Sequence, residues 1–499
     1  MKSLVVLPVV VPLVGAALSL IFRGRAFQRG IALAAAALLL AANLGILAAV
    51  VCQGVLCVQV GNWPAPLGIT LVADRFSAIM LAVAGIVALA GTVYALGTLD
   101  GRRERFGAYP MLQLLWMGVC GAFLAGDLFN LFVWFEVMLI ASYVLMVLGG
   151  ERGQLEGGLK YLGVNLVASA LFLSGVGIVY GMAGTLQMAH LAVRLPAAGP
   201  PGLLTAAAML FLAAFGIKAA VFPFFFWLPA SYHTPPAAVS AVLAGLLTKV
   251  GVYALVRTFT LLAVQDVGYT HNLILMVAAL TMITGVLGAL AQHEFRRVLS
   301  FHIISQIGYM ILGLGLFSPL ALAGAIFYIV HHILVKTCLF FASGLVWRLR
   351  GSYELDRLGG LYSTHPGLCA VFAVPALSLA GLPPLSGFFA KLFLVQASLG
   401  AGQYVLALVA LGVSLLTLFS MNKIWALAFW QPGGSELPGA PVAPRRAGQW
   451  LLAAAPAVLF AGLSIALGLA AGPFLELCRQ AASQLLDPKE YIAAVLGSR

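Results

Sequence analysis

Charged residues are scarce in this chain. Its 499 residues include only 27 Lys and Arg and 15 Asp and Glu, so 8% are charged, whereas an ordinary soluble domain has about 25%. Hydrophobic residues make up 62% of the chain. A fold in water cannot hide that much apolar surface. The composition therefore excludes a soluble protein and indicates that lipid is the solvent.

Motifs for cofactors and metals are also missing. The sequence has no phosphate-binding glycine loop and no nucleotide or metal motif, and its six cysteines lack metal-ligand spacing. The net charge of +12 does not indicate nucleic-acid binding, because the basic residues lie in short loops rather than on one solvated face. We therefore expect no cofactor, no metal and no redox centre in the chain itself.

Long apolar runs fill the sequence. A window of about 20 residues predicts about 14 transmembrane helices. They lie near 3–21, 29–51, 72–98, 108–125, 127–149, 159–182, 203–228, 235–262, 272–291, 298–317, 319–346, 368–398, 402–430 and 450–472. The first run is not a typical cleavable signal, because only Lys2 precedes it and arginines follow it. The predicted fold class is an all-α polytopic membrane protein.

Loop charge predicts the orientation. If the amino terminus lies outside, the inward loops hold 15 of the 27 basic residues, namely Arg23, Arg25, Arg29, Arg102, Arg103, Arg105, Arg152, Lys160, Arg296, Arg297, Arg348, Arg350, Arg357, Arg445 and Arg446. The outward segments hold seven, namely Lys2, Arg75, Arg194, Arg257, Arg479, Lys489 and Arg499. The positive-inside rule then places both termini on the non-cytoplasmic side of a plasma or inner membrane.

Five ionisable residues lie inside the predicted spans. They are Glu136, Lys218, Lys249, Lys336 and Lys391. A charge at the centre of a bilayer costs several kcal/mol, so an ionisable residue there is a functional hypothesis by default. Five of them indicate a protein that moves charge, with protons as the first candidate.

Two of the predicted spans look broken. Pro223 and Pro229 follow Lys218 in the seventh, and Pro383 and Pro384 precede Lys391 in the twelfth. Proline interrupts a helix, and paired interruptions in a transporter indicate inverted repeats. We expect two inverted five-helix repeats, within 108–262 and 272–430, between amino-terminal helices (1–107) and a loop, a last helix and a short tail (431–499). The alternative is that both spans are kinked packing helices.

Several sequence runs resemble a known family. They are GDLFNLFVWFEVMLIASYVLMVLGG, FGIKAAVFPFFFWLPASYHTPPAAVSAVLAGLLTKVGVYALVR, FRRVLSFHIISQIGYM, HHILVKTCLFFASG and LAGLPPLSGFFAKLFL. They resemble the proton-translocating antiporter-like family over about residues 70–430. That family includes the L, M and N membrane subunits of complex I, the large subunits of Mrp-type cation/proton antiporters, and counterparts in membrane-bound hydrogenases. The chain is most similar to the D-type branch of the antiporter subunits.

The resemblance implies that six residues form a proton relay: Glu136, Lys218, Lys249, His332, Lys336 and Lys391. Glu136 and Lys218 match a glutamate and a lysine of the family, and the resemblance implies that these two side chains form an ion pair. Burial favours a neutral lysine, whereas a nearby carboxylate favours a charged one. Movement of Glu136 relative to Lys218 would therefore switch that lysine between keeping and releasing its proton.

Two functions remain open at this point. The resemblance implies a proton-translocating subunit of a multisubunit Na⁺/H⁺ antiporter, with other membrane subunits as partners and protons and Na⁺ as the ions. The alternative is the proton-pumping membrane subunit of a redox complex. Lysine rather than glutamate at 391 counts against the M type. The short stretch after the last span disfavours the L type, which carries a long lateral helix.

Other polar residues have two interpretations each. His302 either lines a channel or bonds between helices, and His331 is either a packing residue or a secondary relay. His233 either gates a half-channel or caps a helix. Lys423 is expected to snorkel to the interface, and Asp127 to act as an N-cap.

Overall fold

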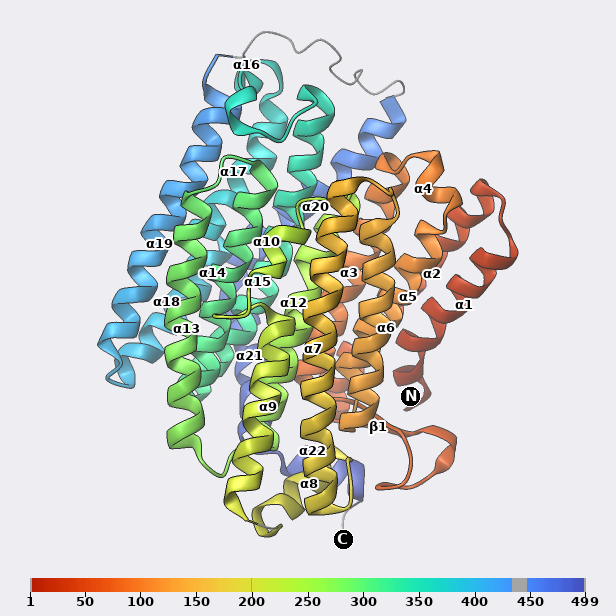
Figure 1. Cartoon of the computed structure of the whole chain (residues 1–499), viewed down its shortest axis with the longest axis vertical. Helices are drawn as coiled ribbons and strands as arrows, with labels where there is room; N and C mark the ends of the chain where they lie inside the picture. Colours follow the sequence, from red (N-terminus) through yellow and green to blue (C-terminus); the bar gives the residue numbers. More distant parts are fainter. Residues whose placement is uncertain (1, 199, 433–446, 498–499) are drawn as a thin grey trace.

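The computed structural model describes residues 2–198, 200–432 and 447–497, and it is almost entirely helical (Figure 1). The helices of the first half are η1 (Lys2–Val6), α1 (Leu7–Ile21), α2 (Arg25–Gln53), η2 (Val60–Asn62), α3 (Arg75–Thr98), α4 (Gly101–Arg105), α5 (Ala108–Leu124), α6 (Leu128–Val147), α7 (Arg152–Ala183), α8 (Met188–Arg194), η3 (Leu195–Ala197), α9 (Pro201–Ala219), α10 (Trp227–Ser231), α11 (Ala237–Val242), the π-helix η4 (Leu243–Leu247) and α12 (Thr248–Leu261). The second half has α13 (Val267–Leu290), α14 (Phe295–Leu316), α15 (Pro319–Arg350), η5 (Leu355–Arg357), α16 (Leu361–Thr364), α17 (Pro366–Ala380), α18 (Ser386–Gly400), α19 (Tyr404–Ile424), the π-helix η6 (Trp425–Trp430), α20 (Ala447–Leu469), α21 (Ala471–Leu486) and α22 (Lys489–Leu496).

The predicted all-α membrane class is confirmed. Within the described residues, 12 helices are long and apolar enough to cross a bilayer, and α5 and α17 are shorter apolar helices. Each predicted span coincides with one of the helices above or with a consecutive set of them. The total of fourteen crossings stays a prediction, because α5 and α17 fall short of full membrane length.

Both predicted helix breaks are present. The seventh span divides into α9 and α10, with Ala220 in the left-handed region at φ 60°. The twelfth divides into α17 and α18, with Gly381 at φ 92°. In Figure 1 the chain rises through the first break and descends through the second. This opposite course supports the inverted repeats, which we keep as a proposal.

The two ends of the chain lie at the same end of the molecule. In Figure 1 the C label is at the bottom and the N label is in the lower half, whereas α4 and α16 lie toward the top. Arg102, Arg103 and Arg105 belong to α4 and therefore lie at this upper end. Of the other basic residues used to predict the orientation, Arg445, Arg446 and Arg499 lie outside the described residues.

The hairpin and the helices of the tail were not predicted. A short antiparallel hairpin pairs β1 (Leu56–Gln59) with β2 (Thr70–Ala73), and the short tail forms α21 and α22. Glu490 on α22 accepts hydrogen bonds from Val55 N at 3.0 Å and from Gln484 at 2.6 Å. The tail is thus anchored at the lower end of the bundle.

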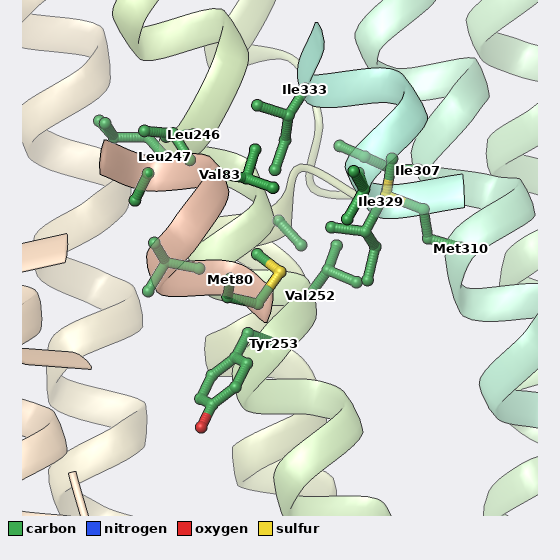
Figure 2. Packing of buried hydrophobic residues seen from close by; sticks show 14 of the residues in the cluster. Met80, Val83, Leu246, Leu247, Val252, Tyr253, Ile307, Met310, Ile329 and Ile333 are labelled. Carbon is green, nitrogen blue, oxygen red and sulfur yellow. The ribbon is translucent and has the colours of Figure 1, made fainter. Parts of the chain in front are cut away.

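The apolar core lies between α3, α12, α14 and α15. Figure 2 shows Met80 and Val83 of α3 near Leu246, Val252, Ile307 and Ile333, which come from the other three helices and η4. The apolar windows of α11–α12 and α15 are 100% buried, and that of α14 is 94% buried. A polar side chain on these helices is therefore surrounded by protein rather than by lipid.

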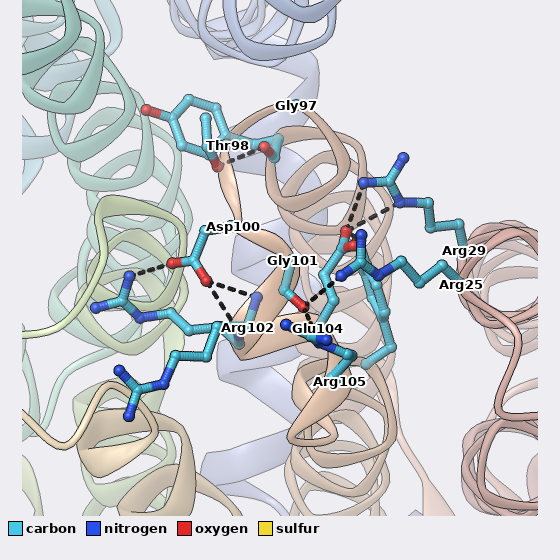
Figure 3. A network of polar contacts seen from close by, with 12 residues as sticks. Arg25, Arg29, Gly97, Thr98, Asp100, Gly101, Arg102, Glu104 and Arg105 are labelled. Atoms are coloured by element: carbon cyan, nitrogen blue, oxygen red, sulfur yellow. Dashed lines mark hydrogen bonds and ion pairs between the residues drawn. The ribbon is translucent and has the colours of Figure 1, made fainter. Parts of the chain in front are cut away.

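An ion-pair network joins the amino-terminal helices to the bundle at its upper end (Figure 3). Arg29 pairs with the buried Glu104 at 2.8 Å, and Tyr109 donates to the same carboxylate at 2.7 Å. Arg25 donates to Gly101 O at 3.1 Å. These contacts hold α2 against α4 and α5.

The placement of Arg257 in an outward segment was wrong. Arg257 lies within α12 and is 5% exposed. It pairs with Asp74 at 2.6 Å and donates to Tyr253 at 3.1 Å. Asp74 also caps α3. A buried charge needs such a partner, so this pair fixes the lower end of α12 against α3.

The contact between α13 and α14 provides a test of the packing. A Cβ at Gly285 would lie 2.3 Å from Ser305 N, whereas one at Gly177 on α7 would meet nothing within 4 Å. Gly285→Ala should therefore lower the free energy of unfolding by about 1–3 kcal/mol through overpacking, and Gly177→Ala should not. Thermal unfolding in detergent measures both. Equal melting temperatures for the two variants would contradict this packing.

Candidate functional site

The centre of the bundle holds a row of buried basic groups. Lys249 on α12 and His332 and Lys336 on α15 are all 0% exposed. Lys249 lies within electrostatic range of both His332 and Lys336. The structure thus brings together three of the six predicted residues, from helices that are distant in sequence.

The two central lysines bind backbone carbonyls. Lys249 Nζ donates to Ala244 O at 2.5 Å, and Lys336 Nζ donates to Leu299 O at 3.1 Å. Ala244 belongs to the π-helix η4, which directly precedes Lys249. A π-turn alters the regular carbonyl pairing and is frequent at functional sites. No sequence signal predicted it.

Both ring nitrogens of His332 are buried without a hydrogen-bond partner among the described residues. Buried polar atoms are nearly always paired with protein or with ordered water. A histidine in this position is suited to accept a proton at one nitrogen and release one from the other.

At the first break, Ser169 connects the predicted pair. Ser169 on α7 donates to the Glu136 carboxylate, and Lys218 Nζ donates to Ser169 Oγ at 3.4 Å. Glu136 lies within electrostatic range of Lys218, but no direct ion pair joins the two side chains in the described structure. The expected direct pair is therefore replaced by a serine-bridged one. Sequence analysis missed Ser169, because serine is common in membrane helices.

A small cavity of about 20 Å³ lies beside Lys218. It is lined by Phe135, Met138, Leu139, Tyr161, Asn165, Lys218, Trp227, Tyr232 and Leu247. This volume holds about one water molecule, and the buried Tyr232 hydroxyl has no partner among the described residues. Because Leu247 belongs to η4, the cavity lies between Lys218 and the helix that carries Lys249.

At the second break, the end of α17 forms a cation site around Lys391. Lys391 Nζ donates to Leu379 O at 2.9 Å, to Ala380 O at 3.1 Å and to Ser414 Oγ at 2.9 Å. Carbonyls at a helix C-terminus lack intrahelical donors and carry partial negative charge. The helix break thus supplies the acceptors for the buried lysine.

Two further buried histidines, His302 and His331, interact with this site and with the centre. Both are 0% exposed, and both lie within electrostatic range of Lys336 and Lys391. His302 Nε2 bonds to Ser420 Oγ at 2.9 Å, and its Nδ1 has no partner among the described residues. Both histidines thus lie within electrostatic range of the last two lysines of the predicted relay.

Other polar residues have structural roles. Lys423 is half-buried and donates to Leu290 O at 2.7 Å and to Gln292 O at 2.6 Å, so it caps the end of α13. Asp127 accepts from Asn130 N at 2.6 Å, which confirms the predicted N-cap of α6. His233 lies half-buried in the loop before α11.

Comparison with known proteins identifies the family. The family described as NADH:quinone oxidoreductase/Mrp antiporter, TM matches residues 125–417. The D subunit of the Na(+)/H(+) antiporter of Alkalihalophilus pseudofirmus is 48% identical, with 99% of this chain and 100% of the relative covered. Its counterpart of the same name in Bacillus subtilis is 40% identical with the same coverage.

A solved structure agrees with this assignment. A chain in the structure of the Mrp complex from Dietzia sp. DQ12-45-1b is similar with a TM-score of 0.91 and 35% identity, and 99% of each chain is covered. The family match spans both helix breaks and every residue of the buried basic row. This chain therefore belongs to the NADH:quinone oxidoreductase/Mrp antiporter family of membrane proteins.

Proposed function

We propose that this chain is the proton-translocating subunit of a multisubunit Na⁺/H⁺ antiporter in the plasma membrane, assembled with other membrane subunits. The observation that carries the proposal is the row of buried basic groups between two helix breaks, at Lys218 and Lys391. It occurs in a chain that is 48% identical to the D subunit of a Na(+)/H(+) antiporter. Its termini then lie outside the cytoplasm, as loop charge predicts.

The proposed relay begins at Lys218 and ends at Lys391. A proton leaves Lys218 when Glu136 and Ser169 move away from it, because the carboxylate favours the charged lysine. It crosses the cavity beside Tyr232 to Lys249, with water as the bridge. It then passes to His332 and Lys336, and through the neighbouring histidines to Lys391.

Repulsion within the row couples the binding of one proton to the release of another. Lys249, His332 and Lys336 lie close together, and no ion pair with a carboxylate joins them in the described structure. Like charges in a low-dielectric interior repel strongly, so the centre favours few bound protons at a time. A proton arriving at Lys249 thus favours release of one farther along.

The alternative is the pump subunit of a redox complex, which the family's name also covers. The names of the relatives at 48% and 40% identity favour the antiporter. The two functions differ in what drives proton movement. A sodium gradient alone drives it in the antiporter, whereas the redox complex needs an electron donor.

The first prediction tests the function itself. In vesicles that contain the complete complex, a Na⁺ gradient should drive proton movement, read with a pH-sensitive dye, in the absence of any electron donor. The physical reason is that exchange is driven by the ion gradient alone. Proton movement that requires an electron donor and ignores Na⁺ would favour the redox alternative.

The second prediction concerns the terminal lysine. Lys391→Ala should abolish Na⁺-driven proton movement and leave assembly of the complex intact, because it removes the last relay group. Lys423→Gln is the matched control, since Lys423 only caps α13, and it should transport at nearly the original rate. Unchanged ion exchange in Lys391→Ala would remove this residue from the relay.

The third prediction concerns the bridging serine. Ser169→Ala should slow Na⁺-driven proton movement, because Glu136 and Lys218 lose the hydroxyl that bonds to both. Ser174→Ala on the same helix should have no effect, because Ser174 is exposed and bonds only to its own helix at Ala170 O. Equal initial rates in the two variants would show that the bridge is dispensable.

A further inference from the structure

Three buried serines meet beside the second helix break. Ser378 closes α17, Ser386 opens α18 and Ser464 lies on α20, and all three are 0% exposed. Their hydroxyls form a triangle with separations of 3.1 Å (Ser378 to Ser386), 3.2 Å (Ser386 to Ser464) and 3.2 Å (Ser464 to Ser378). Helices distant in sequence thus share one hydroxyl cluster.

These hydroxyls bond differently from many of the buried hydroxyls in the described helices. A buried serine or threonine in a helix usually donates to a carbonyl of the preceding turn. Ser398, on the same helix as Ser386, does so at 2.8 Å to Leu394 O, as do residues such as Ser300 and Thr417. The three clustered serines bond instead to one another, to His331 and to Gly387 N. Their hydroxyl protons are therefore shared between helices.

His331 connects the cluster to the lysine row. Its Nδ1 lies 2.9 Å from Ser386 Oγ, and its Nε2 is buried without a partner among the described residues. The ring lies within electrostatic range of Lys391 and Lys336, and it packs edge-on against Tyr328. One side of the ring thus contacts the hydroxyls, and the other remains able to accept a proton from the row.

The backbone around the cluster leaves no room for larger groups. A Cβ at Gly387 would lie 1.7 Å from Ser378 O and 2.9 Å from His331 Cε1. A Cβ at Gly468, one turn beyond Ser464, would lie 2.3 Å from Pro384 O. Glycine at both positions permits α20 and His331 to approach the break closely. The contact of α20 with the break is therefore specified by the sequence.

We propose that His331 and the Ser378–Ser386–Ser464 cluster form a second, hydroxyl-based branch of the proton pathway, which extends it from Lys391 to α20. This inference rests on the proposed function. A neighbouring Na⁺ site fits the cluster less well, because the serines have no carboxylate partner among the described residues and the lysines within electrostatic range of His331, Lys391 and Lys336, are cations.

The proton balance of this branch is simple. A proton from the lysine row binds His331 Nε2, and the proton on Nδ1 moves to Ser386 Oγ. The hydroxyl proton of Ser386 moves to Ser464 Oγ, and a water molecule beside α20 takes the proton that Ser464 gives up. One proton enters and one leaves, and rotation of the hydroxyls and exchange of the histidine tautomer restore the starting state.

The fourth prediction tests the branch in the complete complex reconstituted into vesicles. Ser464→Ala and Ser386→Ala should each lower the initial rate of Na⁺-driven proton movement at least about tenfold, since each breaks the chain of exchangeable protons. The double variant should lose no more than either single one. Ser464→Thr, which keeps the hydroxyl, should retain more activity than Ser464→Ala.

Ser398→Ala is the matched control, because Ser398 is equally buried on α18 and bonds only within its own helix. It should assemble and transport as the original complex does. If the original complex shows no Na⁺-driven movement, the proposed function fails. If it transports, and Ser464→Ala and Ser386→Ala keep the original rate per assembled complex, the branch is wrong, whether or not they assemble less well.

Discussion

Hydrocarbon offers no hydrogen-bond partner, so every polar group that this chain places in the membrane must find its partner within the protein. This constraint explains why the breaks and the lysines occur together. The interruption after α17 frees two carbonyls, and the Lys391 ammonium binds both of them. Each side would be costly to bury alone. The hydrogen bonds between the Lys391 ammonium and these carbonyls therefore stabilise both groups inside the membrane.

The centre of the molecule meets the same constraint with fewer partners. Lys249 and Lys336 each bind one carbonyl, and His332 binds no group of the described chain. Leaving hydrogen-bonding groups without partners costs folding free energy in the fully buried core between α12, α14 and α15. Proteins retain such unfavourable arrangements mainly at functional sites. The proposed relay accounts for it, because a group that exchanges protons cannot be bound permanently on every side.

Sequence analysis located the charged residues well and their connections poorly. Five ionisable residues and both breaks could be found, because charge and proline are rare in membrane helices and therefore conspicuous. His332 and the order of the proposed relay came from the resemblance to the family. Ser169, the π-helix η4 and the serine cluster could not, because serine, leucine and glycine are ordinary there and carry no local signal. The cluster joins residues 378, 386 and 464, and only the packing of α20 against the break unites them. Arg257 was misplaced because its buried partner, Asp74, lies far away in sequence.

Substitution of Lys249 tests the proposed relay most directly. In the proposed order Lys249 stands between the first break and the His332–Lys336 pair, and within the described residues its Nζ bonds only to Ala244 O in the π-helix η4. Lys249→Met keeps much of the side-chain volume and removes the exchangeable protons. In vesicles with the assembled complex, the account predicts that Na⁺-driven proton movement is lost in this variant while assembly is unchanged. Proton movement at the original rate in Lys249→Met would contradict a relay through the buried basic row.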